Sequence, residues 1–172
     1  LDYSIGQILK TLKQQHLDKN TVIIFMSDNG AMDKWNPGNQ YQGRHTANDV
    51  LGSNYPLRDW KTTNYEGAVR VPAIIYWKNK TNSSLNNNYI SVTDLMPTIL
   101  SLAGAKSLPK TVEGQNIWNS IITKDSIQNQ AIYIRGHLQE SITEKPWKLI
   151  RTRHKNAPTV FELFNIEKDP EE

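Results

Sequence analysis

The sequence predicts a layered α/β domain that is followed by a small antiparallel β sheet. Two apolar stretches, at residues 21–26 and 70–77, have the composition of buried strands, and the first directly follows an amphipathic helical segment. Beyond about residue 124, short apolar stretches alternate with polar turns, which is typical of an antiparallel sheet. We therefore assign residues 1–124 to the α/β portion and residues 125–172 to a small antiparallel β subdomain.

The bulk composition is that of a folded domain. The 172 residues are enough for one core, and the content of 37% hydrophobic and 22% charged residues argues against disorder. The formal charge is only +3 and the basic residues are scattered, so we expect no nucleic-acid partner. No apolar run approaches the roughly 20 residues that cross a bilayer, so no membrane span is expected. The absence of cysteine excludes disulfides and a cysteine nucleophile within these residues.

The elements of the α/β portion follow from hydrophobic periodicity. The opening sequence LDYSIGQILKTLKQQH places its apolar residues on one helical face, and TVIIFM then predicts a strand buried on both faces, as in a parallel sheet. A second such strand is expected at residues 70–77, after a polar loop at residues 31–54 whose length indicates a functional role. The sequence TDLMPTILSLAGA predicts a short helix with Thr93 or Asp94 as its cap and Pro97 in its first turn.

The C-terminal portion is expected to contain three strands. They correspond to the sequences AIYIRGHL, PWKLIRTR and TVFELFNI, which are separated by polar turns. Three short strands in succession, without long helices between them, predict an antiparallel arrangement.

The residues Asp28, Asn29 and Gly30 directly follow the first strand. In open α/β sheets, ligands gather beyond the carboxyl ends of the strands. Asp28 and Asn29 offer one charged and one neutral oxygen, which suits a hard cation such as Ca²⁺ or Mg²⁺ better than Zn²⁺. Aspartate, asparagine and glycine are also the commonest turn formers, so a plain turn after the strand is the alternative interpretation.

A group of charged residues lies ahead of the second strand, within thirteen positions: Arg58, Lys61, Glu66 and Arg70. We expect these charges to surround the same crevice as Asp28. A lysine in such a crevice can stabilise an anionic oxygen. Alternatively, Glu66 and Arg70 pair with each other and Lys61 is solvated.

Three blocks of the sequence carry a more specific signal: NTVIIFMSDNG, NYPLRDWKTTNYEGAVRVPAIIYW and TDLMPTILSLAGA. In order, spacing and content they resemble the latter half of the type I sulfatases, near the arylsulfatases. The ending FELFNIEKDPEE is similar to a segment near the C-terminus of that family, so the resemblance covers nearly the whole chain.

The resemblance implies an alkaline-phosphatase-like fold, with a mixed sheet flanked by helices, that hydrolyses sulfate esters with one divalent metal, usually Ca²⁺. Asp28 and Asn29 would then be metal ligands, and Lys61 would contact the sulfate and stabilise the leaving oxygen. Glu66 and Arg70 would fix the loop that carries Lys61. The substrate would be a sulfated small molecule or a sulfated glycan, and the family suggests a secreted, periplasmic or lysosomal location. A basic C-terminal surface would suit a sulfated polysaccharide: Arg135, Lys148, Arg151, Arg153 and Lys155.

The chain also departs from the family pattern. Family members commonly have glycine where this sequence has Asp59 and Ala68, so a different backbone conformation is expected there. The family nucleophile is a formylglycine made within a Cys/Ser-x-Pro-x-Arg motif, which nothing here matches, and the paired aspartates that complete the metal shell are absent. We therefore expect the C-terminal part of a longer polypeptide, with a truncated second subdomain. It would be inactive alone and would have the remainder of the polypeptide as its partner.

Two alternatives to a sulfuric ester hydrolase stay open. One is a phosphate or phosphonate ester hydrolase of the same superfamily, and the other is a non-catalytic carbohydrate-binding relative. Two-zinc phosphatases would be expected to have histidine at position 29, so Asn29 favours a single hard cation and sulfate.

Overall fold

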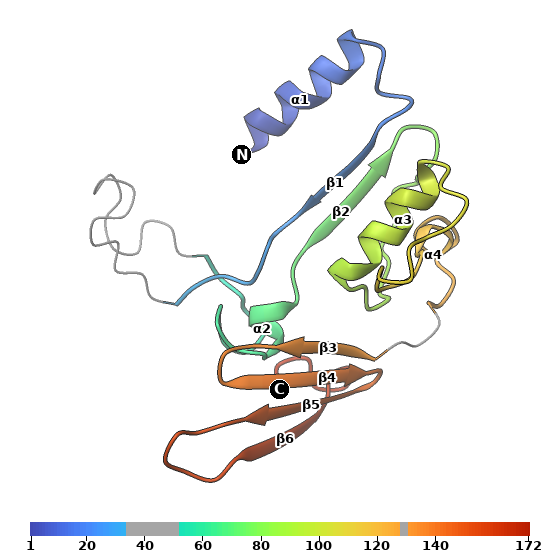
Figure 1. Cartoon of the computed structure of the whole chain (residues 1–172). Coiled ribbons are helices and arrows are strands. Elements are labelled where there is room, and N and C mark those ends of the chain that lie inside the picture. Colours follow the sequence, from blue (N-terminus) through green and yellow to red (C-terminus); the bar gives the residue numbers. More distant parts are fainter. Residues whose placement is uncertain (34–51, 128–130) are drawn as a thin grey trace. The chain divides into compact units, whose positions relative to one another are not determined.

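A computed structural model of the protein describes residues 1–33, 52–127 and 131–172 (Figure 1). The chain groups into two compact units, Leu1–Phe25 with Ala73–Gln128 and Met26–Pro72 with Asn129–Glu172. Most of the polar loop predicted to be functional lies outside the described residues. The predicted domain division after residue 124 stays a prediction, because a compact unit need not coincide with a domain.

Short helices make up much of the first unit: α1 (Asp2–Gln14), η2 (Val92–Asp94), α3 (Leu95–Leu102) and α4 (Trp118–Thr123). A capping box begins the segment that leads into α3, because Ser91 Oγ accepts the Thr93 N–H at 3.3 Å while Asp94 Oδ2 accepts the Ser91 N–H at 2.9 Å. The side-chain cap is therefore Ser91, since the 3₁₀ turn η2 extends the helical segment toward the N-terminus. None of the helices in the described ranges has the length and apolar character needed to cross a bilayer.

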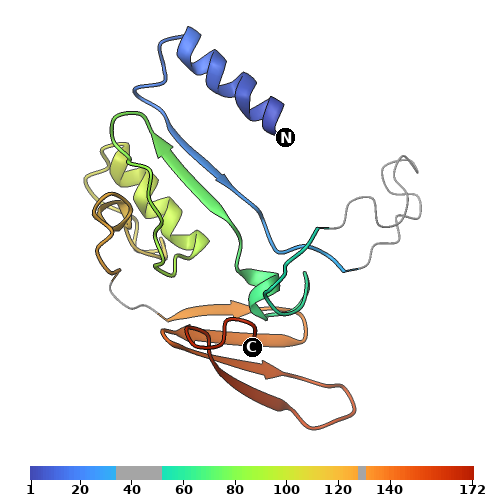
Figure 2. The ribbon, with the colours of Figure 1, turned by 180° about the vertical axis from the view of Figure 1, so that it is seen from behind.

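The first unit also contains a two-stranded sheet of β1 (Val22–Met26) and β2 (Ala73–Trp77). The arrows of the two strands point in opposite directions in both views (Figures 1 and 2), so the pair is antiparallel and the expected parallel arrangement is wrong for it. The expected burial on both faces is also wrong, because every residue of β1 is half-buried and β2 exposes three of its five residues. Among the described residues only these two strands form the sheet, which leaves its faces partly uncovered.

The second unit contains the predicted small antiparallel sheet together with one short helix. Its elements are α2 (Glu66–Val69), β3 (Ile132–Arg135), β4 (Gln139–Glu144), β5 (Trp147–Thr152) and β6 (Val160–Asn165). The strands neighbour one another in chain order, and each pair is antiparallel. The sequence prediction has three strands and misses β4. The inward residues of β4 are the polar Gln139, Ser141 and Thr143, so the strand lacks the apolar alternation by which strands are recognised.

Candidate active site

The loop after β1 carries Asp28 and Asn29 and is held by short-range hydrogen bonds. Ser27 Oγ donates to the Asn29 carbonyl at 2.8 Å, and the Asn29 N–H donates to Asp28 Oδ1 at 3.0 Å. The Asn29 side-chain amide donates to the Gly30 carbonyl at 2.9 Å, a bond that fixes the amide group without using its oxygen. Within the described ranges, neither Asp28 Oδ2 nor Asn29 Oδ1 has a hydrogen-bond partner. Two side-chain oxygens, Asp28 Oδ2 and Asn29 Oδ1, are thus free to coordinate a metal ion, and we call them the two oxygen donors.

Gly30 and Gly67 allow this loop to lie directly against α2. The Gly30 N–H donates to the Ala68 carbonyl at 2.9 Å, and a Cβ on Gly30 would lie 1.8 Å from the Gly67 carbonyl oxygen. Gly67 donates its own N–H to the Arg58 carbonyl at 2.8 Å, and a Cβ there would lie 2.4 Å from the Asp59 carbonyl oxygen. A side chain at either position would collide with backbone, so the three segments can meet only because both residues are glycine.

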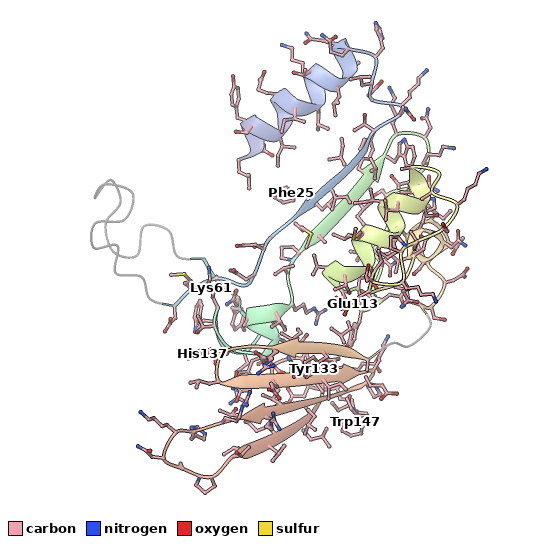
Figure 3. The ribbon with its side chains drawn as sticks, viewed as in Figure 1. Phe25, Lys61, Glu113, Tyr133, His137 and Trp147 are labelled. Atoms are coloured by element: carbon pink, nitrogen blue, oxygen red, sulfur yellow. The ribbon has the colours of Figure 1, made fainter. Side chains whose placement is uncertain are left out.

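Lys61 lies on the segment that is bonded to this loop. Its N–H donates to the carbonyl of Ala31, three residues after Asp28, at 2.9 Å. Asn54 joins the same two segments, because its Oδ1 accepts the Ala31 N–H at 2.7 Å and its amide donates to the Asp59 carbonyl at 2.9 Å. The Lys61 side chain is exposed (Figure 3). The structure therefore brings the backbone of Lys61 beside the loop of the two oxygen donors.

The backbone around Lys61 includes unusual conformations. Asp59 has a φ of 66°, in the left-handed region that glycine adopts most easily and that aspartate tolerates better than most residues. Thr62 has a φ of 91°, which is strained for a β-branched residue. Ala68, by contrast, lies in the short helix α2 and is buried. Strained backbone of this kind clusters at functional sites, where surrounding contacts hold it in place.

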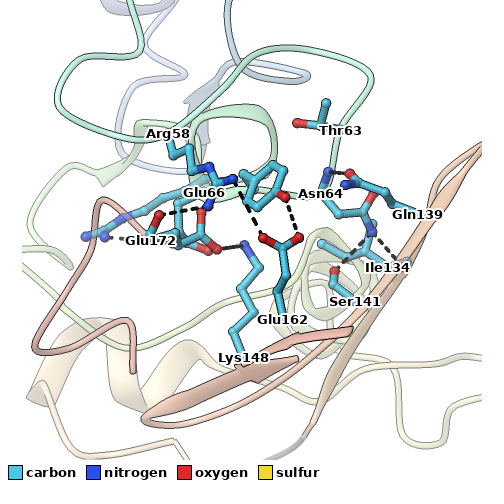
Figure 4. Close-up of polar contacts among 12 residues, drawn as sticks. Arg58, Thr63, Asn64, Glu66, Ile134, Gln139, Ser141, Lys148, Glu162 and Glu172 are labelled. Atoms are coloured by element: carbon cyan, nitrogen blue, oxygen red, sulfur yellow. Dashed lines mark hydrogen bonds and ion pairs between the residues drawn. The ribbon is translucent and has the colours of Figure 1, made fainter. Parts of the chain in front are cut away.

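Glu66, the first residue of α2, is held by a buried lysine of the C-terminal sheet (Figure 4). Lys148 on β5 is 0% exposed, and its Nζ lies 2.8 Å from Glu66 Oε1 and 2.9 Å from Glu172 Oε1. The prediction that Lys148 belongs to a basic surface is therefore wrong, because strand alternation turns it inward. The expected pair of Glu66 with Arg70 is present, but at 3.9 Å it is longer than the contact with Lys148. Burial raises the pKa of Glu172 in spite of the nearby ammonium group.

Arg58 packs against aromatic and acidic groups from the same unit. Its guanidinium carbon lies 4.0 Å from the centre of the Tyr65 ring, and Nη2 lies 3.7 Å from Glu162 Oε1. The Tyr65 hydroxyl donates to Glu162 Oε2 at 2.6 Å. Both Arg58 and Glu66 are thus engaged by the C-terminal sheet, and the prediction that they surround the same crevice as Asp28 stays a prediction.

Asn64 is a further anchor that sequence reasoning missed. It is 1% exposed, and its N–H donates to Gln139 Oε1 at 2.8 Å (Figure 4). Its side-chain amide donates to the Ile134 carbonyl at 2.9 Å and to Ser141 Oγ at 3.1 Å. β4 supplies two of these partners, Gln139 and Ser141, but its sequence is largely polar on both faces and gives no local signal for the contact. Asn64 thus fixes the segment after Lys61 to the sheet.

The arginines of the C-terminal sheet converge on one carboxylate. Arg135 Nε lies 3.8 Å from Glu140 Oε1, Arg153 Nη2 donates to the same oxygen at 2.5 Å, and Arg151 Nη2 donates to Glu140 Oε2. Glu140 neutralises one of these three positive charges and the arginine side chains are partly exposed, so the predicted basic surface stays a prediction for these residues.

The oxygen donors of Asp28 and Asn29 fit part of the shell of a hard cation. A carboxylate and an amide oxygen are the ligand types that Ca²⁺ prefers, but Ca²⁺ takes roughly 6–8 oxygen ligands. In the part of the chain that the structure describes, no group of three or more His, Cys, Asp or Glu side chains could hold a metal ion. Asp28 and Asn29 could therefore supply two of the ligands of such a cation but not its whole coordination shell.

Solved structures share the fold of this chain. A Bacteroides thetaiotaomicron protein of glycosaminoglycan metabolism matches 99% of this chain and 38% of its own, with a TM-score of 0.75 and 24% identity. A phosphonate monoester hydrolase from Silicibacter pomeroyi matches 98% of this chain and 33% of its own, with a TM-score of 0.66 and 20% identity. At these identities the likeness shows the fold alone.

The chain belongs to the sulfatase family. Residues 1–105 match the sulfatase family, and residues 58–172 match the family described as N-sulphoglucosamine sulphohydrolase, C-terminal. The two matches overlap at the segment that carries Lys61 and α2. The expected membership of the type I sulfatases and the expected fold are therefore confirmed.

Curated relatives agree with this assignment. The N-acetylgalactosamine-6-sulfatase of Mus musculus is 30% identical over 150 residues, which cover 86% of this chain and 27% of the mouse protein. The N-acetylgalactosamine-6-O-sulfatase of Bacteroides thetaiotaomicron is 27% identical over 192 aligned positions, which cover all of this chain and 36% of that protein. The chain thus spans about a quarter to a third of the length of these relatives.

The contact at Gly30 predicts opposite effects for two Gly→Ala substitutions. Gly30→Ala should lower the free energy of unfolding by about 1–3 kcal/mol, because the new methyl group meets the Gly67 carbonyl oxygen. Gly6→Ala is the matched control. Gly6 lies in α1 with nothing within 4 Å of its Cβ position, so alanine should stabilise the helix by about 0.5–1 kcal/mol. Urea unfolding of both variants measures this, and equal effects would contradict the close contact.

The environment of Tyr65 predicts a pH dependence in alkali. Burial and the hydrogen bond to Glu162 raise its pKa from the ordinary 10.0 to about 12. Because the folded state holds the proton more tightly, the contribution of Tyr65 to stability is complete below pH 10.0 and is lost as the pH rises through about 12. The difference in phenolate absorbance between the wild type and Tyr65→Phe should therefore have a midpoint of about 12. A midpoint at the ordinary value would show that the hydroxyl is solvated.

Proposed function

We propose that the protein hydrolyses sulfate esters and that Asp28, Asn29 and Lys61 belong to its active site. The observation that carries the proposal is the hydrogen bond from the Lys61 N–H to Ala31, which keeps the lysine segment beside the loop of the two oxygen donors. Membership of the sulfatase family supports sulfate as the group that is removed. A plain turn at Asp28 and Asn29 would not explain why the segment of Lys61 is hydrogen-bonded to the same loop. We therefore favour a cation site over a plain turn.

In this proposal Asp28 and Asn29 hold a hard divalent cation, Ca²⁺. A bound cation of this kind withdraws charge from the sulfate oxygens as the S–O bond breaks. Asp28 supplies a charged oxygen and Asn29 a neutral one, and the amide of Asn29 is oriented by its bond to the Gly30 carbonyl. The hydrogen bond from the Gly30 N–H to the Ala68 carbonyl helps to hold the loop, and with it both oxygen donors, in place.

Lys61 would act on the sulfate group itself. Its ammonium can donate to a sulfate oxygen and can stabilise the negative charge on the departing ester oxygen. The side chain is exposed in this chain, which leaves it accessible to a substrate. The sequence has no cysteine and no serine within the Cys/Ser-x-Pro-x-Arg motif. We therefore propose that a formylglycine nucleophile is supplied by residues of the polypeptide outside this chain.

We propose a sulfated glycan as the substrate class, with a sulfated small molecule as the alternative. The relatives from mouse and Bacteroides thetaiotaomicron are both named for sulfated N-acetylgalactosamine. A protein solved in complex with its substrate D-glucosamine-2-N,6-O-disulfate shares the fold, with a TM-score of 0.62 and 19% identity over 99% of this chain and 32% of its own. Sulfated amino sugars are therefore the first substrates to test.

Hydrolysis of phosphate or phosphonate esters is the second candidate, because a phosphonate monoester hydrolase shares the fold. A sulfate monoester carries one negative charge, whereas a phosphate monoester carries up to two at neutral pH. One cation and one lysine therefore favour sulfate over a phosphate monoester, but a phosphonate monoester carries one negative charge, as sulfate does, and is not distinguished by charge. Turnover of aryl sulfate, aryl phosphate and aryl phosphonate by the same preparation distinguishes these activities, and a non-catalytic relative would turn over none of them.

The role of Lys61 predicts a large loss of rate in the protein that carries this chain. Lys61→Ala should lower kcat on an aryl sulfate by at least about a hundredfold, the scale for removal of one electrostatic stabiliser of the transition state. Lys110→Ala is the control, because Lys110 is an exposed lysine of a loop in the first unit. Steady-state kinetics of both variants provide the measurement. Wild-type turnover by Lys61→Ala would exclude the proposed role.

A further inference from the structure

The short helix α2 connects the two loops of the proposed site. Three of its residues, Glu66, Gly67 and Ala68, are buried. Ala68 accepts the Gly30 N–H at 2.9 Å, so α2 holds the loop that carries the oxygen donors. Gly67 donates to the Arg58 carbonyl at 2.8 Å, so α2 also holds the segment that leads to Lys61. A displacement of α2 would therefore move both loops.

An ion pair between Glu66 and Lys148 fixes the position of α2. Glu66 is its first residue, and the Glu66 carboxylate accepts a hydrogen bond from the buried Lys148 ammonium at 2.8 Å (Figure 4). The other groups that face this contact are Glu172, whose Oε1 lies 2.9 Å from Lys148 Nζ, and Arg70, whose Nη1 lies 3.9 Å from Glu66 Oε2. The Glu66 N–H also donates to the Glu172 carboxylate. Both the side chain and the backbone of Glu66 are thus engaged.

Stability alone is a weak reason for burying this lysine. Removing an ammonium and two carboxylates from water carries a large desolvation penalty, and apolar side chains of similar size often stabilise a fold at least as well. A charged contact is directional, however, and it sets the position of Glu66 more narrowly than an apolar contact would. The buried ion pair of Lys148 is therefore better explained by a need to place Glu66 precisely than by a gain in stability.

We propose that Lys148 is a positioning residue of the proposed active site. Its ammonium fixes Glu66, Glu66 fixes α2, and α2 keeps the loop of Asp28 in register with the loop of Lys61. The proposal rests on the proposed function as far as the catalytic consequence is concerned. The mechanical consequence stands on the hydrogen bonds of α2 alone and can be tested without an activity assay.

Amide hydrogen exchange in Lys148→Met tests the mechanical consequence. The exchange of the Gly30, Lys61 and Gly67 amides should accelerate by about tenfold or more, while the strand amides of β4 and β5 change by less than about threefold. Lys145→Met is the matched control, because Lys145 precedes the same strand and pairs with Glu167 at 3.0 Å on the surface. This control should leave all of these amides unchanged.

Glu66→Gln provides a second variant that keeps an oxygen for Lys148 while removing the charge. It should accelerate the same three amides selectively, and it decides the question if Lys148→Met does not fold. Unchanged exchange at Gly30 and Lys61 in Glu66→Gln would overturn the proposal. Acceleration spread equally over the strands would also overturn it, because the ion pair would then serve stability alone.

Kinetics separate this proposal from the proposed function. On an aryl sulfate, Glu66→Gln should lower kcat by about tenfold with KM within about threefold, as expected when a catalytic group is misplaced. If Lys61→Ala keeps wild-type turnover, the proposed function fails, whatever the exchange data show. If Lys61→Ala is inactive but Glu66→Gln has normal kcat and normal exchange, only the positioning role of Lys148 fails.

Discussion

The backbone contact between Gly30 and Gly67 is the constraint on which the rest of the candidate site depends. Hydrogen bonds hold three backbone segments together at this point, and a side chain on either glycine would lie within the radius of a backbone oxygen. The two oxygen donors and the lysine reach the same region because their segments are fixed at this contact. The positions of the candidate side chains therefore depend on backbone packing at these two glycines. Substitutions at the glycines should be tolerated less well than substitutions in a surface loop.

The C-terminal sheet supports this contact through polar groups. Asn64 bonds to Gln139 and Ser141 of β4, and Glu66 bonds to Lys148 of β5. A sheet that faces its neighbours with polar side chains gives up hydrophobic stabilisation, but hydrogen bonds with defined geometry limit the positions available to the attached loop. We therefore interpret the sheet as a scaffold for the loop of Lys61.

The parts of the fold that sequence could predict are those in which local pattern and final environment agree. The apolar runs of β1 and β2 and the short helix after residue 93 have local signals, and the structure contains all three. The direction of β2 relative to β1 depends on pairing, which a local pattern does not encode. In β5 the pattern is misleading, because Trp147 and Leu149 are exposed whereas Lys148 and Ile150 are buried.

Residue type and position after β1 indicate Asp28 and Asn29 as candidates and the family resemblance adds the role of Lys61, but all three roles stay predictions. The most direct measurement is a titration of the protein with Mn²⁺, a paramagnetic cation that prefers oxygen ligands, followed by amide NMR. The account predicts that the amide signals of Asp28, Asn29 and Lys61 broaden first, and that Asp28→Ala abolishes this selectivity. Broadening that begins elsewhere in the chain, or that persists unchanged in Asp28→Ala, would contradict a cation site beside Lys61.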